Sequence, residues 1–195
     1  MPLRGRVARR LLPTITATLA MVWAAVVHAQ TFDHEHTRIS FEISTRWGER
    51  LLGTFPKHEG AIRTLEDGRQ QVSMRLATAD VMIEGHPRYT EFARGRHFFD
   101  ARRHPWVSFN SDPYDPTLLR QGGKLSGRLH IHGITQDETF VVEPSTCARP
   151  AIDCELVAHG SVRREDYGMD NWKMAVRARV RLELRLRLQH IDGGS

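Results

Sequence analysis

The sequence predicts an all-β fold, a single antiparallel domain of about eight strands with one short helical excursion. Apolar and polar residues alternate with a period of two through most of the chain after residue 30, as in strands that bury one face. Clusters of turn-forming residues separate these runs, and one short stretch breaks the alternation. Such strands hide their apolar faces either in a two-sheet sandwich or in a closed barrel, and periodicity alone does not distinguish the two.

The predicted strands place their apolar residues two positions apart. In chain order, the apolar faces consist of Ile39, Phe41 and Ile43; Val72, Met74 and Leu76; Val107 and Phe109; Leu125, Leu129 and Ile131; Phe140 and Val142; and Leu156, Ala158 and Val162. The last run, from Val176 to Leu188, is the most regular, with arginine or glutamate at every intervening position. A helix would scatter these apolar residues around its circumference, so the run predicts a long strand with a solvated arginine face.

Turns and one short helix are predicted between the strands. Turns are predicted at Glu66-Asp67-Gly68, Asp112-Pro113, Gln121-Gly122-Gly123 and Asp170-Asn171. The segment from Pro87 to Arg94 lacks alternation, begins with proline and is followed by Gly95, which is typical of a short helix.

Residues 1–29 have the composition of a cleaved secretory signal peptide. Four arginines precede an apolar run over residues 11–27, which leads into a signal-peptidase-like site at Ala29. The run contains Pro13 and is short for a membrane span, which favours cleavage over a permanent anchor. We therefore expect a periplasmic protein with a mature domain of residues 30–195 and no membrane-spanning segment.

The net charge gives no support for a nucleic-acid partner. The formal charge is +5, but residues 1–29 carry four arginines and no acid, so the mature domain has a charge of only +1. The basic character that survives is local, around Arg88 to His104 and along Arg177 to Arg187.

The two cysteines of the chain flank a turn-like connection of six residues. Cys147 and Cys154 would be exported into an oxidising compartment if the signal peptide is cleaved. We expect them to pair across a hairpin.

Five segments, in the same order along the chain, carry a family resemblance. They are Asp33 to Phe41, Gly53 to Gly60, Arg94 to Ser111, Ser126 to Thr135 and Arg163 to Met169. The third contains a Phe98-Phe99-Asp100 turn before a strand, and the fourth a Gly-x-Leu hairpin that ends in Gly133-Ile134-Thr135. Together these segments, which span residues 31–188, resemble the YceI-like polyisoprenoid-binding family of bacterial periplasmic proteins.

The resemblance implies a lipocalin-like, closed antiparallel barrel whose lumen holds a long isoprenoid ligand, such as a polyprenyl pyrophosphate or a quinone-like molecule. It implies binding, storage or transport, with no catalysed reaction and no cofactor. The chain has Phe92-Ala93 where many members carry His-Leu, and His97 where they carry an acid, so the head group stays open. The sequence also leaves open a homodimer.

Two residue sets are candidates for ligand contact. The residues expected around the apolar tail are Phe41, Phe55, Phe92, Phe98, Phe99 and Phe109. An isoprenoid tail has no polar group along its length, so its affinity must come from buried apolar surface. The same rings would also serve as plain core. Arg94 and Arg96 belong to the basic cluster and are candidates to pair with a pyrophosphate, although a solvated surface explains them equally.

Two other function classes deserve comparison with lipid binding. One alternative is a metal-binding or haem-binding module that uses the histidines of Asp33-His34-Glu35-His36 and His130-x-His132. The spacing fixes no third ligand, so no metal is expected. An enzyme acting on a small lipidic envelope substrate at the barrel mouth is the other alternative. The sequence contains no Gly-x-Ser-x-Gly elbow, His-Glu-x-x-His motif or phosphate-binding glycine loop, so we expect no catalytic residues.

Overall fold

The computed structural model describes residues 29–189, so the predicted signal peptide lies outside the described residues except for Ala29. The elements in chain order are β1 (Ala29–Thr31), β2 (Arg38–Thr45), β3 (Arg50–Thr54), β4 (His58–Thr64), β5 (Gln70–Ala77), a 3₁₀ helix (Thr78–Asp80), β6 (Met82–Ile83), α1 (Pro87–Arg94), β7 (Trp106–Ser111), α2 (Leu118–Gln121), β8 (Gly123–Ile131), β9 (Ile134–Val142), β10 (Leu156–Arg163), a second 3₁₀ helix (Arg164–Tyr167) and β11 (Val176–Leu186). The fold is all-β, as predicted.

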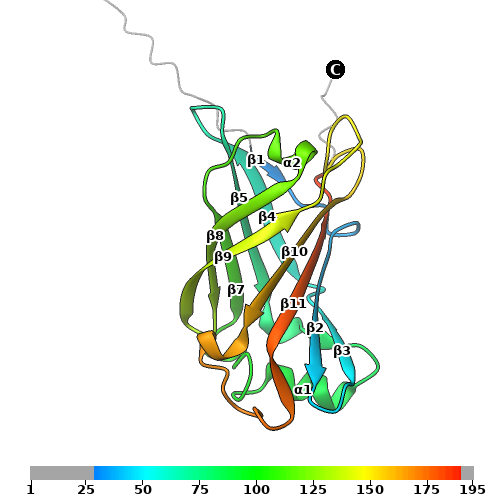
Figure 1. The fold of residues 1–195 in the computed structure, drawn as a ribbon, viewed down its shortest axis with the longest axis vertical. Coiled ribbons are helices and arrows are strands. Elements are labelled where there is room, and N and C mark those ends of the chain that lie inside the picture. The colour runs from blue at the N-terminus through cyan, green and yellow to red at the C-terminus, as the bar shows by residue number, and fades with distance from the viewer. Residues whose placement is uncertain (1–28, 190–195) are drawn as a thin grey trace, which may run out of the picture.

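The described strands form one curled antiparallel sheet (Figure 1). Its eleven strands follow the order β1-β4-β5-β7-β8-β9-β10-β11-β2-β3-β6. An isolated bridge between Phe32 and Leu188 draws the β1 edge against the end of β11, while the ladder as a whole stays open between β1 and β6. The expectation of a closed barrel of about eight strands is therefore corrected to an open, curled sheet of eleven. The count was low because β1 and β6, with three and two residues, are too short to show alternation. The strands β3 and β4 also lacked a predicted run, since Gly53 and Gly60 interrupt their apolar residues.

The core lies inside the curl, where the predicted apolar faces converge. Ile39, Phe41 and Ile43 point inward from β2, and the same parity holds along the other long strands. Glycines in neighbouring strands make room for the largest rings. Phe41 lies opposite Gly53, and a Cβ at Gly53 would lie 2.2 Å from the Phe41 ring. Gly160 provides the same space for Phe140.

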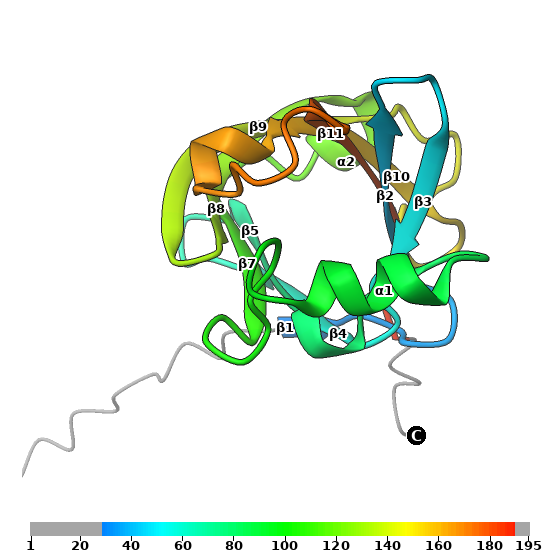
Figure 2. The ribbon, with the colours of Figure 1, turned by 90° about the horizontal axis from the view of Figure 1, so that it is seen from below.

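The helix α1 has the bounds that the sequence predicts, because proline begins it and Gly95 follows it. The Gly95 N–H donates to the carbonyl oxygens of Glu91 and Phe92 and ends the helix. Two contacts fasten α1 to β6 and its flank: Arg94 Nε donates to the Val81 carbonyl at 3.0 Å, and the Ile83 N–H donates to Thr90 Oγ1 at 2.8 Å. Figure 2 shows α1 lying along the rim at one end of the curled sheet. The helix α2 and the two 3₁₀ helices were not predicted.

The predicted disulfide between Cys147 and Cys154 is present. It closes the loop that joins β9 to β10, and Ser145 Oγ contacts both sulfur atoms, at 3.1 and 3.2 Å. A covalent link therefore fixes the connection between two neighbouring strands at the end of the molecule opposite α1 (Figure 1).

Candidate ligand-binding site

The space inside the sheet, which we call the lumen cavity, is lined only by apolar side chains. Its lining residues are Ile39, Phe41, Phe55, Met74, Leu76, Phe98, Phe99, Val107, Leu129, Ile131, Phe140, Val162, Met169, Val180, Leu182 and Leu184. The cavity measures about 40 Å³. Pockets that hold drug-sized ligands measure about 300–1,000 Å³, so side chains nearly fill this lumen.

Phenylalanine rings occupy most of that space. The Phe41 and Phe55 rings lie 5.3 Å apart, Phe55 and Phe99 lie 5.6 Å apart, and Phe98 and Phe99 meet edge to face at 4.8 Å. Such contacts contribute about 0.5–1.5 kcal/mol each beyond the burial of area. The rings therefore form one cohesive cluster inside the sheet.

A second and larger space, which we call the mouth cavity, opens beside α1. It measures about 320 Å³ and therefore falls within the range of ligand pockets. Its lining residues are Ile43, Thr45, Trp47, Leu51, Ile83, Arg88, Tyr89, Phe92, Ala93, Phe98, Trp172, Ala175 and Val176. The β2–β3 turn, α1 and the segment before β11 thus form its walls.

Phe98 lines both cavities and so separates the mouth from the lumen. A row of rings leads inward to it: Trp172 packs edge-on against Phe92 at 5.0 Å, and Phe92 lies 6.5 Å from Phe98. Phe99 continues the row into the lumen. These rings form an apolar row from the mouth cavity to the lumen cavity, with Phe98 at the boundary between the two.

A buried arginine holds the segment that carries Trp172. Arg164 is only 1% exposed, and its guanidinium donates to backbone carbonyl oxygens of the following segment, including Asn171 at 2.5 Å and Val176 at 3.4 Å. It also donates to the carbonyl of Met169. Burial lowers the pKa of Arg164, while the carbonyls satisfy its N–H groups in place of a carboxylate. This network positions one wall of the mouth cavity.

The six predicted aromatic residues divide among the two cavities and the core. Phe41, Phe55 and Phe99 line the lumen cavity, Phe92 lines the mouth cavity, and Phe98 lines both. The sixth, Phe109, lines neither cavity and packs 4.9 Å from Phe140.

The two predicted arginines lie away from the mouth cavity. Arg94 contacts the Val81 carbonyl and Glu91, and Arg96 lies beside His97. Arg88 is the arginine of the same basic cluster that does line the mouth cavity.

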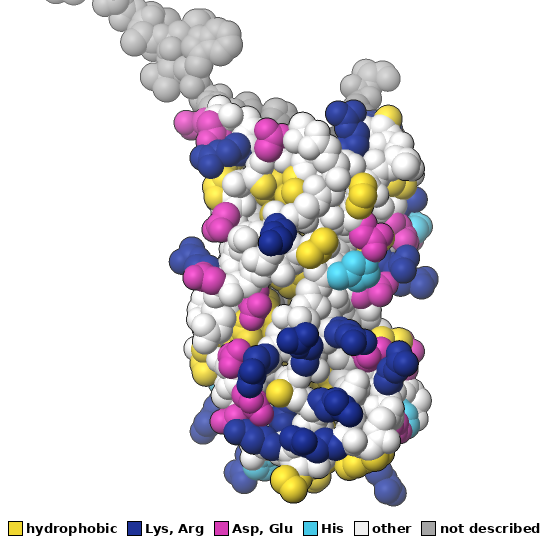
Figure 3. Space-filling model, viewed as in Figure 1, with side chains coloured by type: hydrophobic (Ala, Val, Ile, Leu, Met, Phe, Trp, Pro, Cys, Tyr) yellow, Lys and Arg dark blue, Asp and Glu magenta, His cyan; other side chains and the backbone are white. Residues whose placement is uncertain are grey.

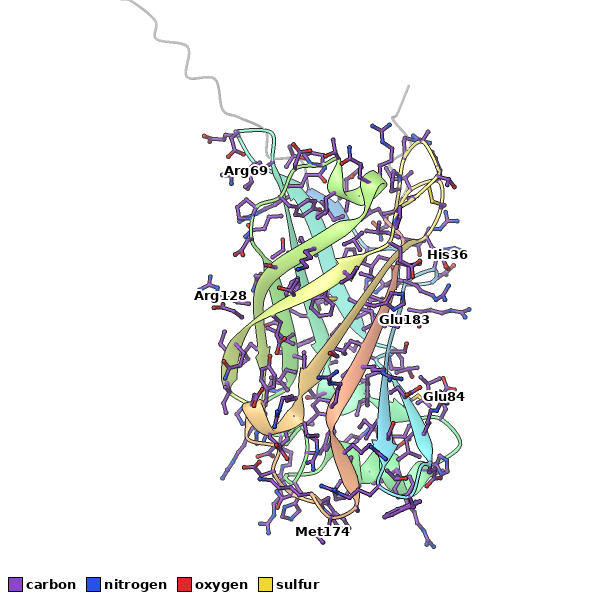
Figure 4. All side chains as sticks on the ribbon, in the orientation of Figure 1. His36, Arg69, Glu84, Arg128, Met174 and Glu183 are labelled. Atoms are coloured by element: carbon purple, nitrogen blue, oxygen red, sulfur yellow. A yellow bond between two sulfur atoms is a disulfide. The ribbon has the colours of Figure 1, made fainter. Side chains whose placement is uncertain are left out.

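Sequence reasoning missed the two tryptophans, Trp47 and Trp172, that line the mouth cavity. Trp47 and Trp172 are 67% and 55% exposed, and Met174 is 87% exposed at the same end of the molecule (Figure 4). Lysine and arginine side chains gather over the lower half of the face in Figure 3, with apolar side chains at its lower tip. The available signal was the position of Trp172 directly after the predicted turn at Asp170-Asn171, since most apolar residues of this size are buried within regular elements.

The chain matches one known family of proteins over most of its length. Residues 30–188 match the YceI-like domain. The chain belongs to the YceI-like family. Its resemblance to that family, expected from five short segments, is thereby confirmed over nearly all of the described chain.

The proteins similar to this YceI-like protein include a sequence relative and two solved structures. The UPF0312 protein SAS2572 of Staphylococcus aureus (strain MSSA476) is 27% identical over 148 residues, which cover 72% of this chain and 81% of that protein. The crystal structure of Burkholderia cenocepacia BcnA superposes with a TM-score of 0.64 at 19% identity, over 80% of this chain and 98% of that one. A polyisoprenoid binding domain from Saccharophagus degradans, implicated in plant cell wall breakdown, gives a TM-score of 0.62 at 13% identity, over 85% and 99%. These two structures share the fold.

Within residues 29–189, no helix combines the length and the apolar character needed to cross a membrane.

Proposed function

We propose that this YceI-like protein binds, stores or carries a long isoprenoid ligand in the periplasm and catalyses no reaction on it. The observation that carries the proposal is the apolar path from the mouth cavity to an entirely apolar lumen, with Phe98 between them. The solved relative from Saccharophagus degradans, described as a polyisoprenoid binding domain, supports the same ligand class.

The tail would enter at the mouth and displace Phe98 on its way inward. Burial of a CH₂ group contributes about 0.8 kcal/mol, so one five-carbon isoprene unit contributes up to about 4 kcal/mol. Moving one ring out of its preferred rotamer costs about 0.5–1.5 kcal/mol, and loss of its aromatic contacts costs a similar amount each. One or two buried units therefore offset the displacement of Phe98 and its neighbours.

The head group would remain at the rim, beside Arg88. This side chain lines the mouth cavity and is exposed, so an anionic head group would bind it while still in contact with water. A guanidinium matches the geometry of phosphate oxygens, which favours a pyrophosphate over an uncharged head. Arg88 thus takes the role that the sequence assigned to Arg94 and Arg96.

The periplasmic location is supported by the disulfide between Cys147 and Cys154, because such bonds persist in oxidising compartments. The signal peptide of residues 1–29 stays a prediction, and signal cleavage is checked by the N-terminal mass of protein recovered from the periplasm.

The decisive experiment is ligand identification. Protein isolated gently from its own cells is extracted with organic solvent, and the extract is analysed by mass spectrometry. We expect a stoichiometric isoprenoid lipid, and the emptied protein should take up a polyprenol. A protein that is empty and fails to take up polyprenols or polyprenyl pyrophosphates would overturn the proposal. Recovery of a chemically altered lipid after incubation would replace binding with catalysis.

The head-group assignment is tested by one pair of variants. Arg88→Gln should weaken polyprenyl pyrophosphate binding about fivefold, the equivalent of about 1 kcal/mol for an exposed ion pair, and leave polyprenol binding unchanged. Arg128→Gln, on the outer face of β8 and labelled in Figure 4, is the matched control and should change neither. Equal affinities of wild type and Arg88→Gln for the pyrophosphate would exclude Arg88 from head-group contact.

A further inference from the structure

Three polar side chains from two segments that are distant in the sequence converge at the end of the sheet where α1 lies. Asp100 follows the Phe98-Phe99 pair, His104 precedes β7, and His132 lies in the turn between β8 and β9. One candidate ligand atom from each residue lies within 4.8 Å of those of the other two. All three side chains are half-buried, so the cluster is neither a free surface nor part of the core.

The backbone around each residue holds the cluster in place. The Asp100 carbonyl accepts hydrogen bonds from the N–H groups of Arg103 and His104, at 2.9 and 2.8 Å. The His104 carbonyl accepts a hydrogen bond from Thr78 Oγ1 at 2.7 Å. Asp100 and His132 have positive φ angles of 44° and 50°, which non-glycine residues adopt only where surrounding structure demands it.

The His132 imidazole is oriented as a metal ligand requires. Its Nδ1 lies 3.2 Å from the Tyr167 carbonyl oxygen. A carbonyl only accepts, so Nδ1 carries the proton and Nε2 has a free lone pair. Metal-bound histidines almost always show this second hydrogen bond, because it fixes the tautomer and the ring orientation.

The other two groups point at one another without making hydrogen bonds. Within the described residues, neither the His104 ring nor the Asp100 carboxylate has a hydrogen-bond partner, although only 13% of the Asp100 side chain is exposed. The nearest cation to Asp100 is Arg103 Nε at 3.9 Å, on a side chain that is 82% exposed. The His104 and His132 rings lie 4.8 Å apart at an angle of 57°, so they are not stacked. Gly133 makes room for His104, since a Cβ there would lie 2.8 Å from the ring.

We propose that Asp100, His104 and His132 form a binding site for a divalent transition metal ion, with Zn²⁺ as the best fit. Two imidazole nitrogens and one carboxylate oxygen are a standard Zn²⁺ donor set, with a fourth position left for water or a small ligand. Tetrahedral Zn²⁺ with bonds of about 2.0–2.2 Å keeps its ligand atoms about 3.3 Å apart. Closing from the present separation needs only small side-chain rotations.

The histidine motif in the sequence suggested a different pair of ligands, His130 and His132. His130-x-His132 placed two histidines on one strand face, but the structure turns His132 out of the strand and leaves His130 Nδ1 2.9 Å from Thr135 Oγ1. The other two ligands, Asp100 and His104, come from a segment about thirty residues earlier, which no spacing rule on β8 anticipates. A bound ion would also anchor Asp100 and, through it, the adjoining Phe98-Phe99 segment.

The test uses the mature protein without a histidine tag, treated with chelator and then titrated with Zn²⁺ by calorimetry. Co²⁺ serves as a coloured probe of the same site. We expect one ion per chain, a higher midpoint of thermal unfolding with Zn²⁺, and a loss of affinity of at least tenfold in His104→Gln and His132→Gln. Asp100→Asn should behave similarly, and it keeps a residue that tolerates positive φ.

Two control variants separate this site from other histidines. His130→Gln, on the same strand, and His36→Gln, in the exposed Asp33-His36 pair, should bind Zn²⁺ as the wild type does. Absence of saturable binding in the wild type would overturn the proposal, as would equal loss in the controls. Unchanged binding in folded His104→Gln and His132→Gln would do the same. None of these results depends on lipid binding.

Discussion

Replacement of Phe98 by alanine tests the proposed path most directly. Phe98 is buried and lies between a lumen cavity of about 40 Å³ and a mouth cavity of about 320 Å³. Phe98→Ala joins the two spaces. The truncation should lower the free energy of unfolding by about 3–5 kcal/mol, as for other buried phenylalanines. It should also remove the cost of displacing the ring, about 1–2 kcal/mol, and so tighten isoprenoid binding about 5- to 30-fold.

Phe109→Ala is the matched control, because Phe109 is equally buried but lines neither cavity. Stability is measured by denaturant unfolding, and affinity by competition of a polyprenol with a fluorescent apolar probe. We expect both variants to lose similar stability and only Phe98→Ala to gain affinity. Phe98→Leu, a milder truncation, should show a smaller gain in the same direction. If Phe98→Ala binds no more tightly than wild type, or if Phe109→Ala gains as much, Phe98 is not the barrier between the cavities.

Three further predictions concern stability. Cys147→Ser combined with Cys154→Ser should lower the free energy of unfolding by about 2–3 kcal/mol in denaturant titration, because the unfolded chain regains loop entropy; an unchanged midpoint would argue against this. Arg164→Met should cost at least about 3 kcal/mol and speed hydrogen exchange of residues 169–177, since it leaves buried carbonyls without donors; protection equal to wild type would contradict that role. His58 is buried, and burial lowers its pKa below 6.5, so the folded state binds fewer protons than the unfolded state. Stability should therefore be fully present above about pH 6.5 and fall as pH decreases through the folded pKa, and His58→Leu should reduce this slope, whereas the exposed His97→Gln should leave it unchanged.

Local signals predicted most of the fold. Alternation placed the inward residues of the long strands correctly, because one buried face leaves only one register that hides every apolar side chain. Proline and glycine marked both ends of α1. The edges of the sheet escaped prediction. β6 has two residues, and its pairing with β3 at Gly53 and Thr54 depends on the fold around it rather than on its own pattern.

The candidate sites depended on contacts that no local pattern encodes. Phe41 and Phe140, on the predicted inward parity of β2 and β9, line the lumen, because parity decides that placement. Parity does not account for Phe98 and Phe99, which lie in the connection before β7. The mouth needed Arg164 to hold the segment of Trp172, and the proposed metal site needed two loops to meet. Both arrangements bring together residues that are far apart in the sequence. The order of the strands in the sheet decides which of these residues meet.

The filled lumen follows from the energetics of a chain of this size. Empty apolar space in a core costs about 24 cal/mol per Å³, so a permanent cavity of 500 Å³ would cost about 12 kcal/mol. That figure is comparable to the whole stability of a typical domain, about 5–15 kcal/mol. Apolar side chains that fill the inside of the curled sheet avoid this cost, and Phe41, which packs over Gly53, is one of them. Under the proposed function, a ligand would gain room only where such side chains rotate aside, and its own apolar surface would replace the contacts that they lose.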